Sequence, residues 1–136
     1  MWRDDKRVRK QAIWTIGFLV LQYALGIATN LYVKFPDGVK EGQAWEFAWK
    51  QVLLAAHIIL GILLFVGAVA LAVRAYRNKD KVWIRASGVY LLAIFLAGFA
   101  GSSFVSKQIE VYSLIMALSF IAAILSLVWG IVNSKK

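Results

Sequence analysis

Long apolar runs alternate with short polar connections along this chain. Four such runs lie at about 12–33, 52–73, 82–101 and 111–132. Each is close to the roughly 20 residues with which an α-helix crosses a hydrocarbon core about 30 Å thick. Because the runs are continuously apolar, and backbone groups find no partners in lipid, helices are the structure that satisfies them. The pattern predicts an all-α polytopic membrane protein, a single domain over 1–136 that forms an antiparallel four-helix transmembrane bundle with an outer loop at 34–50.

The composition supports lipid as the solvent. The chain is 61% hydrophobic and only 17% charged, with a mean hydropathy of +0.69, whereas a soluble domain is about half apolar. Too few polar side chains are available to cover a water-soluble core. The chain has no cysteine, so disulfides, thiol chemistry and thiolate metal sites are excluded.

The basic residues predict an orientation. Twelve of the sixteen Lys and Arg precede the first run, lie between the second and third runs or in the first turn of the third, or follow the fourth. They are Arg3, Lys6, Arg7, Arg9, Lys10, Arg74, Arg77, Lys79, Lys81, Arg85, Lys135 and Lys136. The positive-inside bias therefore predicts a multi-pass protein of a prokaryotic plasma membrane with cytoplasmic amino and carboxyl termini. The net charge of +9 is interpreted as attraction to the lipid bilayer; no segment is long enough to form a nucleic-acid-binding face.

The connection at 34–50 has two recognisable parts. Pro36 presets its own dihedral and Gly38 can take a positive φ, so a tight turn is expected there. The aromatic-rich stretch at 45–49 predicts a short interfacial helix that runs into the second span. A connector resting on lipid and a lid over a binding site are the two interpretations of this segment.

Small residues are spaced to lie on one face of the third and fourth runs. They are Ala93, Ala97, Gly101, Ser119, Ala123, Ser126 and Gly130. In lipid, close van der Waals contact at small residues is a main source of helix association. The spacing predicts close packing, either within one bundle or in a homodimer or larger membrane complex.

His57 is the one ionisable residue deep inside a run. It lies six residues after Gln51, about 9 Å below the outer end of the second helix at 1.5 Å per residue. Polar and small residues of the first run are spaced to share one broad face, with Gly26 near the depth of His57. They are Thr15, Gln22, Gly26, Thr29 and Asn30. This face predicts either simple interhelical hydrogen bonding or a polar cavity lined with His57.

Met116 of the fourth run also lies near the depth of His57. Histidine and methionine from facing helices can hold a haem iron in a bundle, so haem b bound by His57 and Met116 is one hypothesis. A dimer with two facing His57 residues is another way to ligate haem. One histidine without intramembrane acids provides no other metal site, and no catalytic triad can be assembled at membrane depth.

The residues Gln22, Gly26, Asn30 and Pro36, followed by His57 with Gly61 one turn later, resemble half of the membrane haem bundle of haem A synthase and cytochrome b561. The resemblance implies a haem-ligating role for His57. The second ligand histidine of those families is absent, and Leu54 stands where the synthase has an acidic residue. The overall layout is similar to small four-span membrane proteins of prokaryotes.

Three functional hypotheses follow. The leading one is a non-enzymatic subunit or scaffold of a membrane complex that packs through its small residues. The second is a haem-binding or redox module that uses His57. The third is a carrier or channel for a small solute, lined by Gln22, Thr29, Asn30 and His57.

Overall fold

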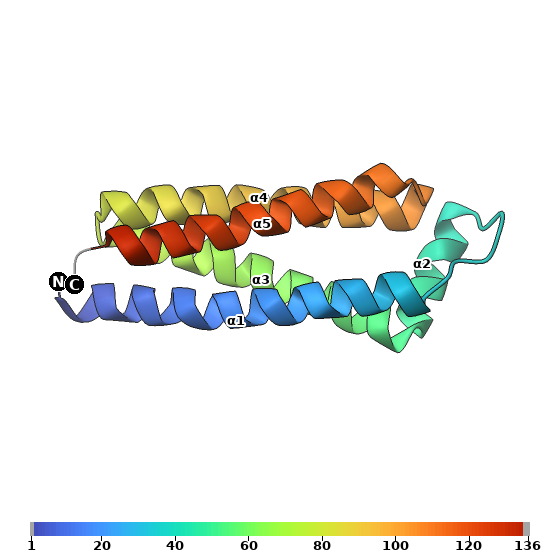
Figure 1. Cartoon of the computed structure of the whole chain (residues 1–136), viewed down its shortest axis with the longest axis horizontal. Helices are drawn as coiled ribbons and strands as arrows, with labels where there is room; N and C mark the ends of the chain where they lie inside the picture. Colours follow the sequence, from blue (N-terminus) through green and yellow to red (C-terminus); the bar gives the residue numbers. More distant parts are fainter. Residues whose placement is uncertain (1, 135–136) are drawn as a thin grey trace.

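The computed structural model describes residues 2–134, with the side chains of residues 2–5 and 41 left undescribed, and all regular structure in this range is helical (Figure 1). The helices are α1 (Trp2–Tyr32), α2 (Glu41–Lys50), α3 (Val52–Arg77), α4 (Lys81–Lys107) and α5 (Glu110–Asn133). All except α2 are long and apolar enough to cross a membrane. The predictions of an all-helical chain and of four long apolar helices are therefore confirmed.

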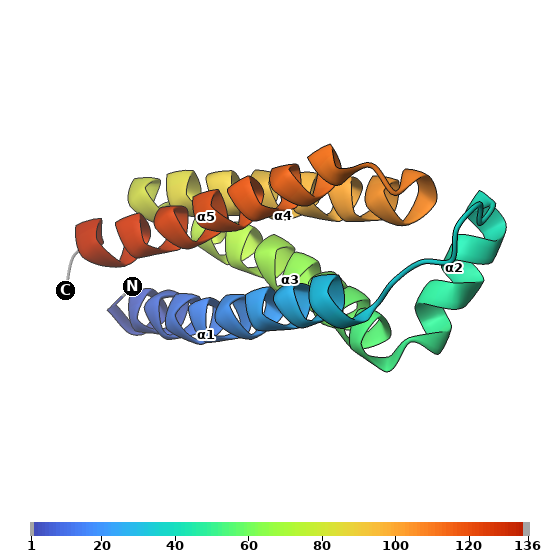
Figure 2. The same ribbon diagram turned by 45° about the vertical axis from the view of Figure 1, so that its right-hand side comes forward.

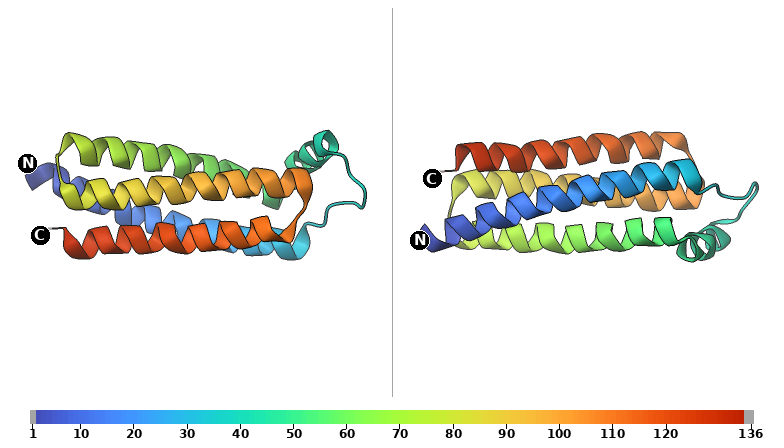
Figure 3. Two further views of the ribbon diagram at one scale, coloured as in Figure 1. Left: turned by 90° about the horizontal axis from the view of Figure 1, so that it is seen from above. Right: turned by 60° about the horizontal axis from the view of Figure 1, so that its bottom comes forward.

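The four long helices pack side by side in an antiparallel bundle. Helix α1 contacts α3 and α5, and α4 contacts the same two helices. Figure 3 shows the consequence: from one side α4 lies between α3 and α5, and from the other side α1 does. Helices α3 and α5 are therefore diagonal to each other. The beginning of α1 and the end of α5 lie at the same end of the bundle as the connection between α3 and α4 (Figure 1).

The helices extend beyond the apolar runs that predict them. Helix α1 begins at Trp2, so most of the basic segment before the first run is helical. Helix α4 continues to Lys107, well past the predicted end at 101, and stops where Gln108 takes the left-handed conformation with φ 55°. Hydropathy marks which part of a helix lies in lipid, whereas a helix ends only where its backbone hydrogen bonding stops.

The connection between α3 and α4 is a tight turn with a defined cap. Lys79 has a positive φ of 55°. The Asp80 carboxylate oxygen Oδ1 then accepts hydrogen bonds from the backbone amides of Val82 at 2.8 Å and Trp83 at 3.2 Å. Asp80 is therefore the N-cap of α4, satisfying amides that have no partner within the helix.

Helices α4 and α5 form the most closely packed pair. Trp83 and Leu127 are fully buried, and a Cβ placed on Gly130 would lie only 2.8 Å from Cζ3 of Trp83. Ser119, Ala123 and Ser126 are buried along the same face of α5. Most of the small-residue stripe on α5 therefore packs within one chain, where the glycine lets the indole approach the backbone.

Helix α2 lies across the end of the bundle opposite the two termini, at an angle to the long helices (Figure 2). The predicted turn before it is confirmed, because Gly38 has a φ of 71° within the turn Asp37–Gly38. Ala44 and Ala48 are fully buried, and the Trp45 indole Nε1 donates to Ser106 Oγ of α4 at 3.2 Å. The predicted short helix is present, but it does not run into α3, because the backbone turns at the residue between them.

Candidate functional site

The polar residues predicted to share one level of the bundle meet where α1 packs against α3. The Gln22 side-chain nitrogen Nε2, on α1, donates to the backbone carbonyl of His57, on α3, at 3.0 Å. The same nitrogen lies 3.4 Å from Nε2 of the His57 imidazole. One amide group therefore contacts both the backbone and the side chain of His57.

This arrangement fixes the orientation of both side chains. A backbone carbonyl can only accept, so the amide nitrogen of Gln22, and not its oxygen, must face His57. Since an amide nitrogen can only donate, a hydrogen bond between it and the imidazole Nε2 at 3.4 Å requires that Nε2 accepts. A neutral imidazole that accepts at Nε2 carries its proton on Nδ1. Nδ1 of His57 is therefore a donor.

Two glycines make this contact possible. A Cβ placed on Gly26 would lie 3.2 Å from Cε1 of His57, and a Cβ on Gly61 would lie 3.2 Å from Nε2 of Gln22. Each helix thus presents a polar side chain to a glycine of the other helix. We call this reciprocal contact of Gln22, Gly26, His57 and Gly61 the α1–α3 clasp.

The predicted polar face is only partly assembled. Gln22, Gly26 and His57 are brought together, whereas Asn30 is exposed on α1. Three buried polar atoms near this level have no hydrogen-bond partner: Gln22 Oε1, Thr29 Oγ1 and His57 Nδ1. Because buried polar atoms are normally paired, each of these atoms has hydrogen-bonding capacity that the protein itself does not use.

The two residues of the hypothetical haem site contact different helices. His57 turns toward α1, where its ring is in contact with Gly26, so the clasp occupies the space expected beside the imidazole. Met116 belongs to α5, the helix diagonal to α3, and its sulfur lies 3.2 Å from the position of a Cβ on Gly101 of α4. The two proposed ligands therefore pack against different neighbours.

A second polar link between α1 and α3 was not predicted. Closer to the end of the bundle where α1 begins, Gln11 Nε2 donates to the backbone carbonyl of Gly67 at 3.4 Å. The Arg74 guanidinium donates to Oε1 of the same glutamine at 2.6 Å. Gln11 and Gln22 are eleven residues apart, close to three helical turns, so they lie on one face of α1. This spacing is the feature of the sequence from which a second polar contact of α1 could have been predicted.

No protein-family model, curated protein or solved structure matches this chain in the comparisons made. Among the residues that the structure describes, no group of three or more His, Cys, Asp or Glu could hold a metal ion. The function is therefore argued from the clasp, the charge distribution and the surface of the bundle.

Proposed function

We propose that this protein is a multi-pass protein of the plasma membrane with both termini in the cytoplasm. The support is the agreement between fold and charge. The antiparallel bundle places the beginning of α1, the α3–α4 connection and the end of α5 at one end, and these segments contain most of the basic residues. Large apolar side chains are exposed along all four long helices, which is the surface expected against lipid chains.

Within the membrane, the proposed role is that of a non-enzymatic subunit or scaffold of a membrane complex. The observation that supports it best is the α1–α3 clasp. His57 is the ionisable residue that could have marked a reactive site, and its ring instead packs on Gly26 while its backbone binds Gln22. The deep polar groups are used to hold two helices together.

Two experiments test this proposal. Because the chain lacks cysteine, single cysteines at Lys40 and Lys79 can be labelled with a membrane-impermeant maleimide in intact cells. Labelling of the cysteine at position 40 alone is expected. Labelling of the cysteine at position 79 alone would show that the orientation is the opposite of the one proposed. Native electrophoresis after mild solubilisation should show a discrete species well above the 15.2 kDa of one chain. If protein solubilised from native membranes migrated as a monomer, it would contradict the role of subunit.

A carrier for a small polar solute is the second candidate, supported by the three buried polar atoms without partners. A solute passing between α1 and α3 would meet His57 Nδ1 and Thr29 Oγ1. Glycerol uptake into proteoliposomes, followed by light scattering, tests this function. Uptake that exceeds that of empty liposomes and is lost in His57→Leu would support the carrier, whereas uptake equal to that of empty liposomes would remove it.

A further inference from the structure

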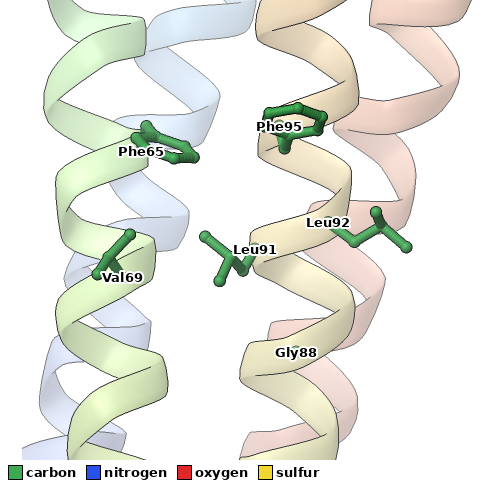
Figure 4. Close-up of a pocket in the computed structure, with 6 residues that line it drawn as sticks. All are labelled: Phe65, Val69, Gly88, Leu91, Leu92 and Phe95. Atoms are coloured by element: carbon green, nitrogen blue, oxygen red, sulfur yellow. The ribbon is translucent and has the colours of Figure 1, made fainter.

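An apolar groove runs along the outside of the bundle between α3 and α4. It consists of two adjoining hollows of about 350 and 370 Å³ that share Gly88. Phe65 and Val69 of α3 face Leu91 and Phe95 of α4 across the first hollow (Figure 4). The second hollow continues toward the inner end of the bundle, where it is lined by Tyr76 and Ile84, among others.

The floor of the groove is open at Gly88. A Cβ placed on this glycine would meet no atom within 4 Å, so the missing side chain leaves a depression that no other part of the chain fills. The neighbouring Ser87 hydroxyl donates to the Trp83 carbonyl of its own helix at 2.6 Å. The groove therefore offers apolar contact along its length.

The length of the groove matches one leaflet of a bilayer. From Arg85 to Phe95 there are ten residues of α4, which span about 15 Å at 1.5 Å per residue. Half of a hydrocarbon core about 30 Å thick is the same length. In the orientation proposed above, on which this inference rests, that leaflet is the inner one.

Cations surround the inner mouth of the groove. Lys81 lies seven residues before Gly88, about two turns away on the same face of α4. Arg77 follows the groove residue Tyr76, and Arg85 follows Ile84; Arg77, Lys81 and Arg85 are exposed. Among the residues whose side chains the structure describes, the only ion pair lies at the opposite end of the bundle, between Lys50 and Glu46.

We propose that this groove binds an anionic phospholipid of the inner leaflet. One acyl chain lies along the groove over Gly88, and the phosphate is held by Arg77, Lys81 and Arg85. An apolar channel one leaflet long that ends in a cluster of cations is complementary to such a lipid. A second copy of the chain fits less well, because a two-fold axis along the membrane normal would bring these cations against their own counterparts.

The groove is tested by filling it. In Gly88→Leu the new Cβ meets no atom within 4 Å, and the leucine side chain adds apolar volume to the floor of the groove. Gly98→Leu is the matched control, since Gly98 is on the same helix, also meets nothing within 4 Å and does not line the groove. Val73→Trp fills the second hollow from the α3 side. It replaces Gly88→Leu as the groove-filling variant if circular dichroism shows that Gly88→Leu does not fold.

The cations are tested by neutralising them. A triple variant changes Arg77, Lys81 and Arg85 to Gln, and its matched control changes Lys34, Lys40 and Lys107 at the outer end to Gln. Loss of each cation near an anionic membrane surface weakens the interaction about fivefold. The inner triple variant is therefore expected to lose its preference for anionic lipid, and the outer one to keep it.

Native mass spectrometry of the detergent-purified full chain, given equal amounts of phosphatidylglycerol and phosphatidylcholine, provides the measurement. The wild type and both controls should retain phosphatidylglycerol preferentially, and the groove-filling and inner triple variants should not. Equal retention of the two lipids by the wild type would overturn the proposal. Unchanged lipid retention in Gly88→Leu would also overturn it. If Gly88→Leu instead separated two copies of the chain while lipid retention stayed the same, the occupant of the groove would be a second copy and the proposal would be wrong. Lipid retention in detergent does not depend on how the protein is oriented in the membrane. A reversed orientation in the labelling experiment would therefore refute the proposed topology without deciding whether the groove binds lipid.

Discussion

Replacing Gly130 with alanine tests the packing of α4 against α5. A Cβ at this position would lie 2.8 Å from Cζ3 of Trp83 and 2.9 Å from Cβ of Ala86. Carbon atoms in contact prefer about 3.5–4.0 Å, so both neighbours would have to move by roughly an ångström. Trp83 is fully buried and Ala86 nearly so, and neither is the free end of a flexible side chain.

The expected loss of stability combines two effects. Overpacking a close-packed core costs about 1–3 kcal/mol, whereas alanine is favoured over glycine in a helix by up to about 1 kcal/mol. With the full offset, the free energy of unfolding of Gly130→Ala should fall by about 0–2 kcal/mol relative to wild type, and by about 1–3 kcal/mol relative to a glycine-to-alanine change without overpacking. Gly98→Ala is the control, because its Cβ meets nothing within 4 Å and only the helix-propensity gain applies.

Reversible unfolding in mixed micelles, followed by circular dichroism, measures both variants. In a Trp83→Leu background the two closest ring atoms are absent and only the contact with Ala86 stays, so the penalty of Gly130→Ala should fall. A Gly130→Ala protein as stable as Gly98→Ala would refute the packing described for this interface. An undiminished penalty in the Trp83→Leu background would show that the indole is not its cause.

Three further predictions concern the clasp, the N-cap of α4 and the ion pair of α2. Gln22→Leu removes both contacts to His57. Because hydrogen bonds between membrane helices are worth about 0.6 kcal/mol each on average, the free energy of unfolding in the micelle assay should fall by about 1 kcal/mol. An unchanged value would show that the clasp does not stabilise the fold. Asp80→Ala should cost about 1 kcal/mol through loss of the N-cap, and Asp80→Asn should restore most of it, because asparagine also caps. The Lys50 ammonium, bonded to Glu46 at 2.6 Å, holds the pKa of that carboxyl below its ordinary value of 4.5. A lowered folded-state pKa means that the contribution of this pair is complete above pH 4.5 and is lost as the pH falls below it; NMR titration should show a higher Glu46 pKa in Lys50→Met.

The sequence determined the elements of this fold. Continuous apolar runs of about 20 residues leave helices as the one structure that satisfies the backbone in lipid, and four long apolar helices are found. Pro36 and Gly38 likewise specify a turn through their own backbone preferences, and the positive φ of Gly38 agrees. The nearness of Gly26 to His57 follows from counting residues along two antiparallel helices.

The tertiary structure alone decided which faces meet. It made α3 and α5 diagonal, turned Met116 toward Gly101, left Asn30 exposed and opened the groove at Gly88. In a soluble protein, hydrophobic periodicity shows which side of a helix is buried. In this chain large apolar side chains are exposed as well as buried on all four long helices, as expected where lipid is the solvent, so apolar residues do not mark the buried side of a helix. The choice of neighbours then depends on the fit of small residues and a few hydrogen bonds, which exist only once the helices are in place.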